Sequence, residues 1–322
     1  MSQLYPQEKI YIGADISKAT IDIFNNQTGE FCTINNDKAA IKRFLKSVKV
    51  PATIVFEATG GYERKLSDLL ENHPMLTRLR VHPACVKAFA RALGSKAKTD
   101  KIDAYMLAKA AQTMPETFVD TTPSAHIQDL RDMLTYQKQL EAMRHNEKCR
   151  LKMDDITPMV LKQIQQHIAF IDKQITKIQA DILKLIKQDA SLSRQYTDLQ
   201  KVCGVGPAIA LCIIAFLPEL GRIDRRQVAS LAGLAPRTRQ SGTKTGRAFT
   251  QGGRKALRQA LYMGALVGVR HNPVLKDFYT RLVENGRPKM VALIATTRKL
   301  LIHLNANEKR YLQSNAKTNI NH

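Results

Sequence analysis

Residues 11–57 read YIGADISKATIDIFNNQTGEFCTINNDKAAIKRFLKSVKVPATIVFE, and this stretch decides the fold of the N-terminal part of the chain. Three short runs at 11–17, 19–26 and 31–36 are rich in β-branched and aromatic residues and are separated by turn residues, so they predict three consecutive strands. The run at 37–48 is typical of a helix, and the apolar run at 52–61 predicts a buried strand.

The sequence that follows continues as an alternation of helix and strand. We expect a helix at 62–73, a strand at 78–83 and two helices around 84–93 and 100–112. Three strands in a row, followed by alternating helices and strands, indicate a mixed sheet covered by helices. The predicted first domain, residues 1–122, is therefore α/β with an RNase H-like order of elements.

Residues 123–196 are predicted to be helical, with a heptad pattern over about three and a half repeats. The pattern is carried by eight apolar residues spaced alternately three and four apart: Leu161, Ile164, Ile168, Ile171, Ile175, Ile178, Ile182 and Leu185. Pro158 fits the first turn of this helix, and a less regular helix precedes it at about 127–152. Two interpretations stay open: a helical hairpin packed within one chain, or a protruding coiled coil that joins subunits.

Residues 197–310 form the predicted third segment, which is mostly helical. It begins with KVCGVGPAIALCIIAFLPEL at 201–220, where Gly-Val-Gly between two apolar runs resembles a helix-hairpin-helix whose backbone amides can approach a phosphate. LAGLAP at 231–236, the glycine- and threonine-rich stretch 237–255 and a helix at 256–270 follow. We expect the polar tail, residues 311–322, to be frayed.

The chain is strongly basic, and its surplus is concentrated at the C-terminal end. Its 322 residues carry a formal charge of +22, and residues 197–322 hold 21 Lys and Arg against six Asp and Glu. Between Arg222 and Arg258 there are ten basic residues and one acid, Asp224. Such a surplus favours contact with nucleic acid, and a solvated basic face is the alternative.

Membrane-spanning and secreted proteins are the classes that the sequence excludes. No run of 18 uncharged apolar residues occurs, and the first residues lack a signal-peptide core, so we expect a cytoplasmic protein without membrane contact. The five cysteines are isolated, which predicts reduced and mostly buried thiols rather than a zinc site or a disulfide framework.

Four carboxylates are candidates for a metal site. Asp15 and Glu57 end two strands that are neighbours in an RNase H-like sheet, while Asp100 and Asp103 share one face of a helix start. Together they could hold two divalent ions, and Mg²⁺ is the expected metal because it prefers oxygen ligands. The alternatives are turn residues and helix caps. Asp22 is set aside because it alternates to the solvent side, and Glu63 because it fits a helix start.

Ser241 lies in a basic stretch and is the candidate nucleophile. A serine hydroxyl needs a base or a metal to remove its proton, and surrounding cations could bind a scissile phosphate. The alternative is a phosphate-binding loop in which the serine only donates a hydrogen bond. The cations that we expect to contact nucleic acid are Arg237, Arg239, Lys244, Arg247, Arg254 and Lys255.

In their order, these motifs resemble one known family. GADISK with Asp15, FEATGGYE with Glu57, KTDKIDA with Asp100 and Asp103, then GVGP, LAGLAP and RQSGTKTGR with Ser241 are similar to the DEDD transposases of bacterial insertion sequences. This group includes pilin-gene-inverting recombinases and bridge-RNA-guided recombinases. The resemblance covers about residues 8–310.

The resemblance implies a RuvC-like first domain, a coiled-coil segment and a transposase domain with a nucleophilic serine. In such a family Ser241 would form a covalent phosphoserine link to DNA, and the four carboxylates would bind Mg²⁺. The family's partners would be donor and target DNA, a non-coding bridge RNA, and further copies of the chain in a dimer or tetramer.

Three other functions compete with this interpretation. A RuvC-like junction nuclease would use the same carboxylates to activate water and would give no protein–DNA adduct. A non-catalytic nucleic-acid-binding protein would show no magnesium-dependent strand breakage. GADISKATIDIF is also faintly similar to the first phosphate loop of actin-like ATPases, although the very basic C-terminal region argues against that class.

Overall fold

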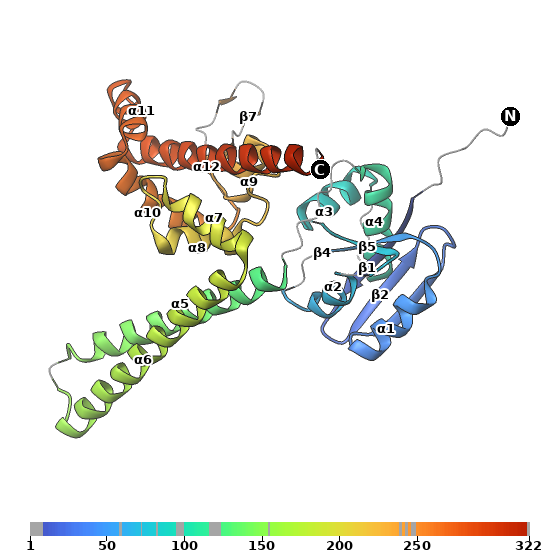
Figure 1. Cartoon of the computed structure of the whole chain (residues 1–322), viewed down its shortest axis with the longest axis horizontal. Coiled ribbons are helices and arrows are strands. Elements are labelled where there is room, and N and C mark those ends of the chain that lie inside the picture. Colours follow the sequence, from blue (N-terminus) through green and yellow to red (C-terminus); the bar gives the residue numbers. More distant parts are fainter. Residues whose placement is uncertain are drawn as a thin grey trace. The chain divides into compact units, whose positions relative to one another are not determined.

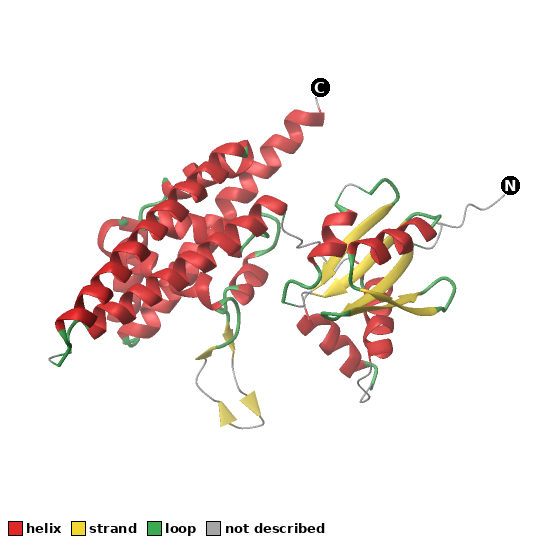
Figure 2. Ribbon diagram, turned by 90° about the horizontal axis from the view of Figure 1, so that it is seen from below, coloured by secondary structure: helices red, strands yellow, loops and turns green. Residues whose placement is uncertain are grey.

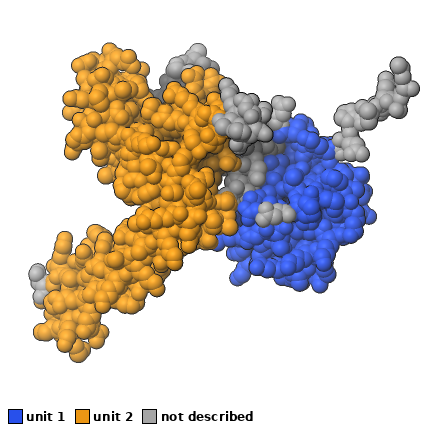
Figure 3. All heavy atoms as spheres, in the orientation of Figure 1, with its two compact units in different colours: residues 1–122 blue, residues 123–322 orange. Residues whose placement is uncertain are grey.

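The chain forms two compact units, residues 1–122 and residues 123–322, which Figure 3 distinguishes by colour. The computed structural model describes residues 9–57, 60–71, 73–81, 83–94, 100–115, 124–153, 155–237, 240–241, 244–245 and 249–320. Each of the four clusters of buried apolar side chains lies within one of the two units. Each unit therefore has an apolar core of its own.

The first unit contains one sheet and four helices among its described residues (Figure 1). In chain order the elements are β1 (Ile10–Ile16), β2 (Thr20–Asn25), β3 (Phe31–Asn35), α1 (Lys38–Ser47), β4 (Ala52–Glu57), α2 (Arg64–Leu70), β5 (Leu76–Val81), α3 (Pro83–Ala92) and α4 (Asp100–Thr113). Every strand and helix that the sequence predicted for this unit is present. The main differences are β4, which ends at Glu57 rather than at residue 61, and β5, which begins and ends two residues earlier than predicted.

The five strands lie in the order β3-β2-β1-β4-β5. The β1–β2 and β2–β3 pairs are antiparallel, whereas β1–β4 and β4–β5 are parallel. This mixed sheet, with its strands in this order, fits the RNase H-like arrangement that the alternation of elements predicted.

Helices cover both faces of the sheet (Figure 2). On one face, Ile12, Ile54 and Phe56 pack with Ile41 of α1 and Leu66 of α2. On the other face, α3 and α4 pack over residues that alternate with these, among them Tyr11 and Val55. Because successive side chains of a strand point to opposite faces, the face of any strand residue follows from its neighbours.

The second unit is helical apart from four two-residue strands among its described residues. Its elements are α5 (Ala125–Arg150), α6 (Pro158–Gln188), α7 (Ala190–Gln200), α8 (Pro207–Phe216), α9 (Arg225–Leu231), β6 (Pro236–Arg237), β7 (Gln240–Ser241), β8 (Lys244–Thr245), β9 (Phe249–Thr250), α10 (Lys255–His271), α11 (Pro273–Glu284) and α12 (Lys289–Ile320). Pro158 is the first residue of α6, as its fixed backbone angle predicted.

The α5 and α6 helices form a long hairpin that projects from the rest of this unit (Figure 1). The heptad residues Ile171 and Ile175 pack against Leu140 of α5, and all three are at most 5% exposed. The heptad seam is thus buried within a single chain, as in the first of the two interpretations. An assembly that used this same seam would have to open the hairpin.

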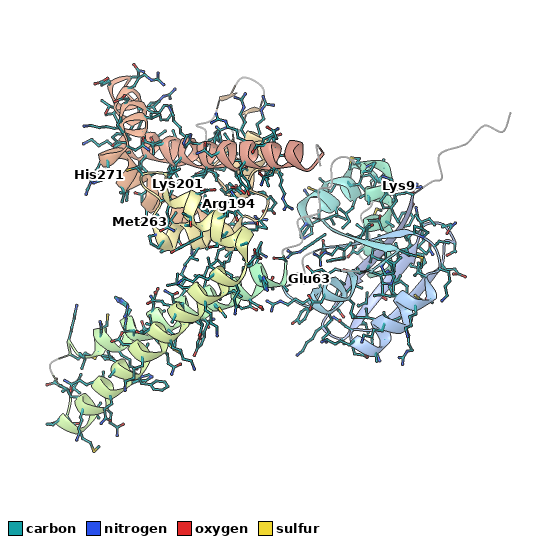
Figure 4. All side chains as sticks on the ribbon, in the orientation of Figure 1. Lys9, Glu63, Arg194, Lys201, Met263 and His271 are labelled. Atoms are coloured by element: carbon teal, nitrogen blue, oxygen red, sulfur yellow. The ribbon has the colours of Figure 1, made fainter. Side chains whose placement is uncertain are left out.

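The base of the hairpin joins the core of the helical body. Leu130 of α5 and Ile182 of α6 are buried together with residues of α8, α10 and α12. Arg194 of α7 binds Glu308 of α12 through two hydrogen bonds of 3.0 and 2.6 Å. Figure 4 labels Arg194 and shows it beside α12.

The C-terminal tail is more ordered than we expected. The α12 helix extends nine residues past Tyr311, to Ile320, where the sequence predicted a frayed tail beginning at residue 311. The guanidinium of Arg194 lies 3.5 Å from the centre of the Tyr311 ring, and this contact fixes the helix to α7 at the point where fraying was expected. The helix then continues through a mostly polar stretch to Ile320.

The cysteines are free, as predicted, but most of them are not buried. Cys32, Cys85, Cys149 and Cys203 are exposed, and only Cys212 is partly covered. Burial raises the pKa of the Cys212 thiol to about 11, so that thiol stays protonated at neutral pH. The prediction of burial failed because the other four lie at surface positions of their strand, helices and turn.

None of the helices in the described part of the chain combines the length and the apolar character that a bilayer crossing needs.

Candidate functional site

Asp15 and Glu57 lie at matching ends of two neighbouring strands. The parallel β1–β4 pair runs in register as far as Ala14 opposite Phe56, so Asp15 and Glu57 are the next residues on each strand. Ala14 and Phe56 point to the face covered by α1 and α2, which places the two carboxylates on the opposite face. Both acids are partly buried. The sheet thus brings together two of the four predicted ligands.

The face that carries these two carboxylates is the one covered by α4. A Cβ atom at Gly13 would lie 1.9 Å from the carbonyl oxygen of Ala104, so α4 rests directly on β1 two residues before Asp15. Asp103, which precedes Ala104 in α4, is partly buried. Asp100 is the first residue of the same helix, and its side chain lies outside the described residues. The start of α4 and the strand ends therefore share one face.

The structure also places Asp22, which the sequence analysis set aside, on this face. Asp22 is the cross-strand partner of Asp15 in the antiparallel β1–β2 pair, and partners in such a pair point the same way. It is partly buried and accepts a 2.5 Å hydrogen bond from the Thr33 hydroxyl. Asp22 is partly exposed, and it also shares the face of Asp15, which the sequence did not predict.

Glu63, by contrast, belongs to the opposite side of the sheet. Its carboxylate accepts a 2.9 Å hydrogen bond from the Gly61 amide and pairs at 3.1 Å with Arg80, which lies beside Phe56 in the sheet. Glu63, labelled in Figure 4, is only 6% exposed. It closes the turn after β4.

Oxygen ligands of this kind suit a hard divalent cation. Asp15, Glu57 and Asp103 offer only carboxylate oxygens, which is the chemistry that Mg²⁺ prefers. Among the side chains that the structure describes, no three acidic, histidine or cysteine residues come close enough to form a metal-binding group. Asp15, Glu57 and Asp103 belong to that set and do not form such a group, whereas the side chain of Asp100 lies outside it, so the four-ligand site stays a prediction.

The predicted nucleophile lies in a two-residue hairpin of the second unit. Ser241 ends β7, and its backbone pairs with Lys244 of the antiparallel strand β8. The backbone of Arg237 belongs to β6, which pairs with β9 at the base of the same loop (Figure 2). The side chains of these three residues, and the whole of Arg239 and Arg247, lie outside the described residues. The predicted roles of these five residues therefore remain predictions.

The base of this loop is clamped to the helical body. Gly233 and Gly253, both with positive φ, are packed so closely that a Cβ on Gly253 would lie 2.1 Å from the Gly233 nitrogen. Arg254 forms two 2.6 Å hydrogen bonds to Glu219, whose side chain is 2% exposed, and a third of 2.9 Å to the Phe216 carbonyl. Arg258 donates to the Gly252 carbonyl. The strands that carry the serine loop therefore start from a rigid base.

These contacts change the interpretation of the two cations predicted at the end of the basic stretch. Arg254 is committed to Glu219 and is 30% exposed, so its first role is structural. Lys255 is exposed at the start of α10 and stays available to a ligand.

Gly204 of the Gly-Val-Gly motif is packed on α10, where a Cβ would lie 2.6 Å from the Gly264 carbonyl oxygen, whereas Gly206 is open to solvent. The close packing against α10 thus explains why residue 204 is a glycine.

Comparison with known proteins agrees with this arrangement. A transposase model of the DEDD, IS110 type matches residues 12–158, which include all four predicted metal ligands. A second model, for the transposase family IS116/IS110/IS902, matches residues 196–280, which include Ser241. Pilin gene-inverting proteins of Moraxella lacunata and Moraxella bovis are each 28% identical to the chain over 306 residues, covering 91% of this chain and 94% of the relative.

Proposed function

The chain belongs to the IS110 family of transposases, enzymes that recombine DNA, and from this premise we propose that it cuts and rejoins DNA strands through a covalent phosphoserine at Ser241. Asp15, Glu57, Asp100 and Asp103 would bind Mg²⁺ in a RuvC-like domain. The observation that carries the proposal is the position of Asp15 and Glu57 at matching strand ends beneath α4.

The carboxylates have a clear task in this reaction. Mg²⁺ bound to them would stabilise negative charge that develops on the phosphate. The protein holds the ligands in place through the β1–β4 register and the close contact of α4 with Gly13. Asp22, directly across from Asp15, adds negative charge on the same face and so strengthens the attraction for a cation.

The serine supplies the covalent chemistry. The Oγ atom of Ser241 would bond to phosphorus as one phosphorus–oxygen bond of the DNA breaks, and the departing oxygen would take up a proton. Because one phosphate ester replaces another, the strand can be resealed in the reverse sense without ATP, which agrees with the absence of a Walker-type phosphate loop from the sequence. Cations around the serine would bind the phosphate and its developing charge.

We also propose that an RNA guides the enzyme and that it acts as a dimer or tetramer. The surplus of 15 positive charges in residues 197–322, with 6% aromatic residues and no tryptophan in the chain, suits binding along a nucleic-acid backbone. In that case base pairing with the RNA, rather than side chains, would read the sequence of the DNA.

The direct test is to trap the covalent adduct. Purified protein, the element's RNA, Mg²⁺ and labelled donor and target DNA are run on a denaturing protein gel. We expect a labelled band at the mass of the protein that Ser241→Ala removes, while Ser230→Ala, at an exposed serine of α9, keeps it. Asp103→Asn should reduce the band strongly, and Asp68→Asn on the exposed side of α2 should not.

The same gel separates the proposal from the nuclease alternative. A RuvC-like junction nuclease would cut the DNA in a Mg²⁺-dependent way without leaving label on the protein. Cleavage by the Ser241→Ala variant at the wild-type rate would therefore refute the serine as nucleophile and support activated water.

A further inference from the structure

A groove of about 720 Å³ opens beside the base of the serine loop. One wall is formed by the paired strands β6 and β9, and the other by α11 and α12. The groove is lined mainly by apolar side chains, among them Phe249, Phe278 and Val291. Its volume lies in the range of roughly 300–1,000 Å³ that is typical of sites for small organic groups.

Several of the lining side chains are more exposed than apolar residues usually are. Phe249 is 37% exposed, Met290 59% and Val291 52%. Exposed apolar groups gathered at one groove mark a binding surface more often than single scattered ones do. The surface is therefore shaped to receive an apolar group.

Arg298 brings a positive charge to the groove. Its Nε atom is buried and has no hydrogen-bond partner, and the side chain forms no ion pair with any described residue. The next residue, Lys299, also lines the groove, with its ammonium 4.3 Å from the centre of the Phe278 ring. None of the twelve lining residues is acidic. Arg298 and Lys299 thus place two cations at an otherwise apolar groove, which favours an anionic ligand.

The ligand must therefore combine an apolar, flat part with an anion. A nucleotide does so, because its base stacks on aromatic rings and its phosphate binds Arg and Lys. An acidic peptide with an aromatic residue would offer the same two groups, but the basic charge of residues 197–322 favours nucleic acid. The location points to DNA, because Pro236 and Thr250, which pair at the base of the Ser241 loop, both line the groove.

We propose that this groove binds a nucleotide turned out of the DNA strand that is cut. The base would lie against the apolar wall that includes Phe249 and Phe278, and the adjoining phosphate would bind Arg298 and Lys299. This inference rests on the proposed function, since it holds the strand next to the loop of Ser241. Proteins can turn a single nucleotide out of the helical stack in this way, as enzymes that modify a base do.

The test measures binding without cleavage. The full-length protein in EDTA is titrated into a 20-base-pair DNA duplex that carries one unpaired 2-aminopurine, and into the fully paired duplex. We expect the unpaired base to improve the affinity about tenfold, the scale of one stacked base, and its fluorescence to change on binding. An RNA duplex with the same unpaired base should show a smaller gain.

Two exposed valines provide a matched pair of variants. Val291→Glu places a carboxylate in the groove, whereas Val267→Glu places one on α10, outside the groove lining, at a similar exposure of 47%. The first should abolish the preference for the unpaired base and the second should keep it. Arg298→Gln should weaken binding about tenfold and reduce the dependence of log affinity on log salt by about one, with partial recovery in Arg298→Lys.

Four results would overturn the inference. The first two are an equal affinity of the wild type for both DNA duplexes and an equal effect of the two valine variants on that affinity. The third is a larger gain in affinity from the unpaired base in RNA than in DNA. The fourth is a change of particle mass in light scattering caused by Val291→Glu alone, which would make the groove an interface between copies. A wild type that binds neither duplex gives the first of these results, and the adduct gel then decides separately whether the proposed function holds. Arg298 variants are compared only where circular dichroism shows a wild-type melting temperature, and the exposed valine pair does not depend on them.

Discussion

At the residue scale, Gly13 controls how closely α4 approaches the sheet. Any side chain there would meet the backbone of Ala104, and Asp103 and Asp15 lie one and two residues from this contact. The sequence showed a glycine in the predicted strand that contains GADISK. Only the packing shows that this glycine sets how closely the strand with Asp15 approaches the helix with Asp103. The same holds for Asp22, because the sequence did not predict that it lies opposite Asp15 on the same face of the sheet.

We predict that Gly13→Ser separates α4 from β1. The added side chain should lower the free energy of unfolding of the first unit by about 1–3 kcal/mol, because an overpacked core strains its neighbours. Strand transfer should fall by more, about a hundredfold, because a shift near 1 Å misplaces catalytic groups. The control is Gly206→Ser, where no atom lies within 4 Å of the added Cβ and serine can cap α8. Equal melting temperatures for the two variants in circular dichroism would contradict the prediction.

Arg254 and Lys255 are neighbours with different expected roles, and mutation separates them. Arg254→Ala leaves the buried carboxylate of Glu219 without its partner, which should lower the free energy of unfolding by about 3–5 kcal/mol. Lys255→Ala at an exposed position should change it by less than about 0.5 kcal/mol. Urea unfolding measures both. A small effect of Arg254→Ala would mean that the guanidinium is free to contact DNA, as the sequence alone predicted.

At the scale of elements, the spacing of apolar residues predicted where helices form, but it did not predict which helices pack against each other. The seam from Leu161 to Leu185 identified α6, and Pro158 fixed its start. The apolar pattern of α6 is the same whether it packs on α5 of the same chain or on a helix of another copy. The pattern of α5 is less regular, so the sequence did not identify α5 as the partner. The burial of Ile171 against Leu140 shows the partner within the chain.

Adjacent residues of α6 test this packing. Ile171 is 2% exposed and Phe170 is 59% exposed. Ile171→Asp should therefore lower the free energy of unfolding of the second unit by about 3–5 kcal/mol, since it buries a charge and leaves a cavity. Phe170→Asp should leave it nearly unchanged. If light scattering instead showed that Phe170→Asp alone reduces the mass of the particle, the outer face of the hairpin would be the surface that joins subunits.

The junction of α6 and α7 should weaken in acid. Burial on its own would raise the pKa of Asp189, but hydrogen bonds from the amides of Leu192 and Ser191 and from the His126 ring hold it below its ordinary value. The stabilisation is therefore complete above the unfolded pKa of about 3.9 and is lost as the pH falls through the lower folded value. Asp189→Asn should keep the cap of α7 and show a smaller drop in melting temperature between pH 5 and pH 3 than the wild type. An unchanged drop would refute a role for this carboxylate.

At the scale of the whole molecule, the predicted chemistry is divided between two units. Asp15, Glu57 and Asp103 belong to the first, and Ser241 and the groove beside its loop belong to the second. The sequence predicted both sets of residues from local motifs. It could not predict the groove, because Phe249, Phe278 and Arg298 come from separate elements and form no motif.

Because each unit has its own apolar core, we expect calorimetry to resolve two unfolding transitions. Gly13→Ser should shift one of them, and Leu261→Ala, in a fully buried position of α10, should shift the other by an amount equivalent to about 2–5 kcal/mol. These two variants assign each transition to its unit.

Once the transitions are assigned, Mg²⁺ becomes a test of the carboxylate site that needs no DNA. A ligand that binds only the folded state stabilises it, by about 2.7 kcal/mol at a hundred times its dissociation constant. Mg²⁺ should therefore raise the transition of residues 1–122 and leave that of residues 123–322 in place. Asp103→Asn should abolish the shift, whereas Asp68→Asn should preserve it. A shift of both transitions, or a shift that survives in Asp103→Asn, would mean that the ion binds elsewhere and that the four carboxylates have a structural role.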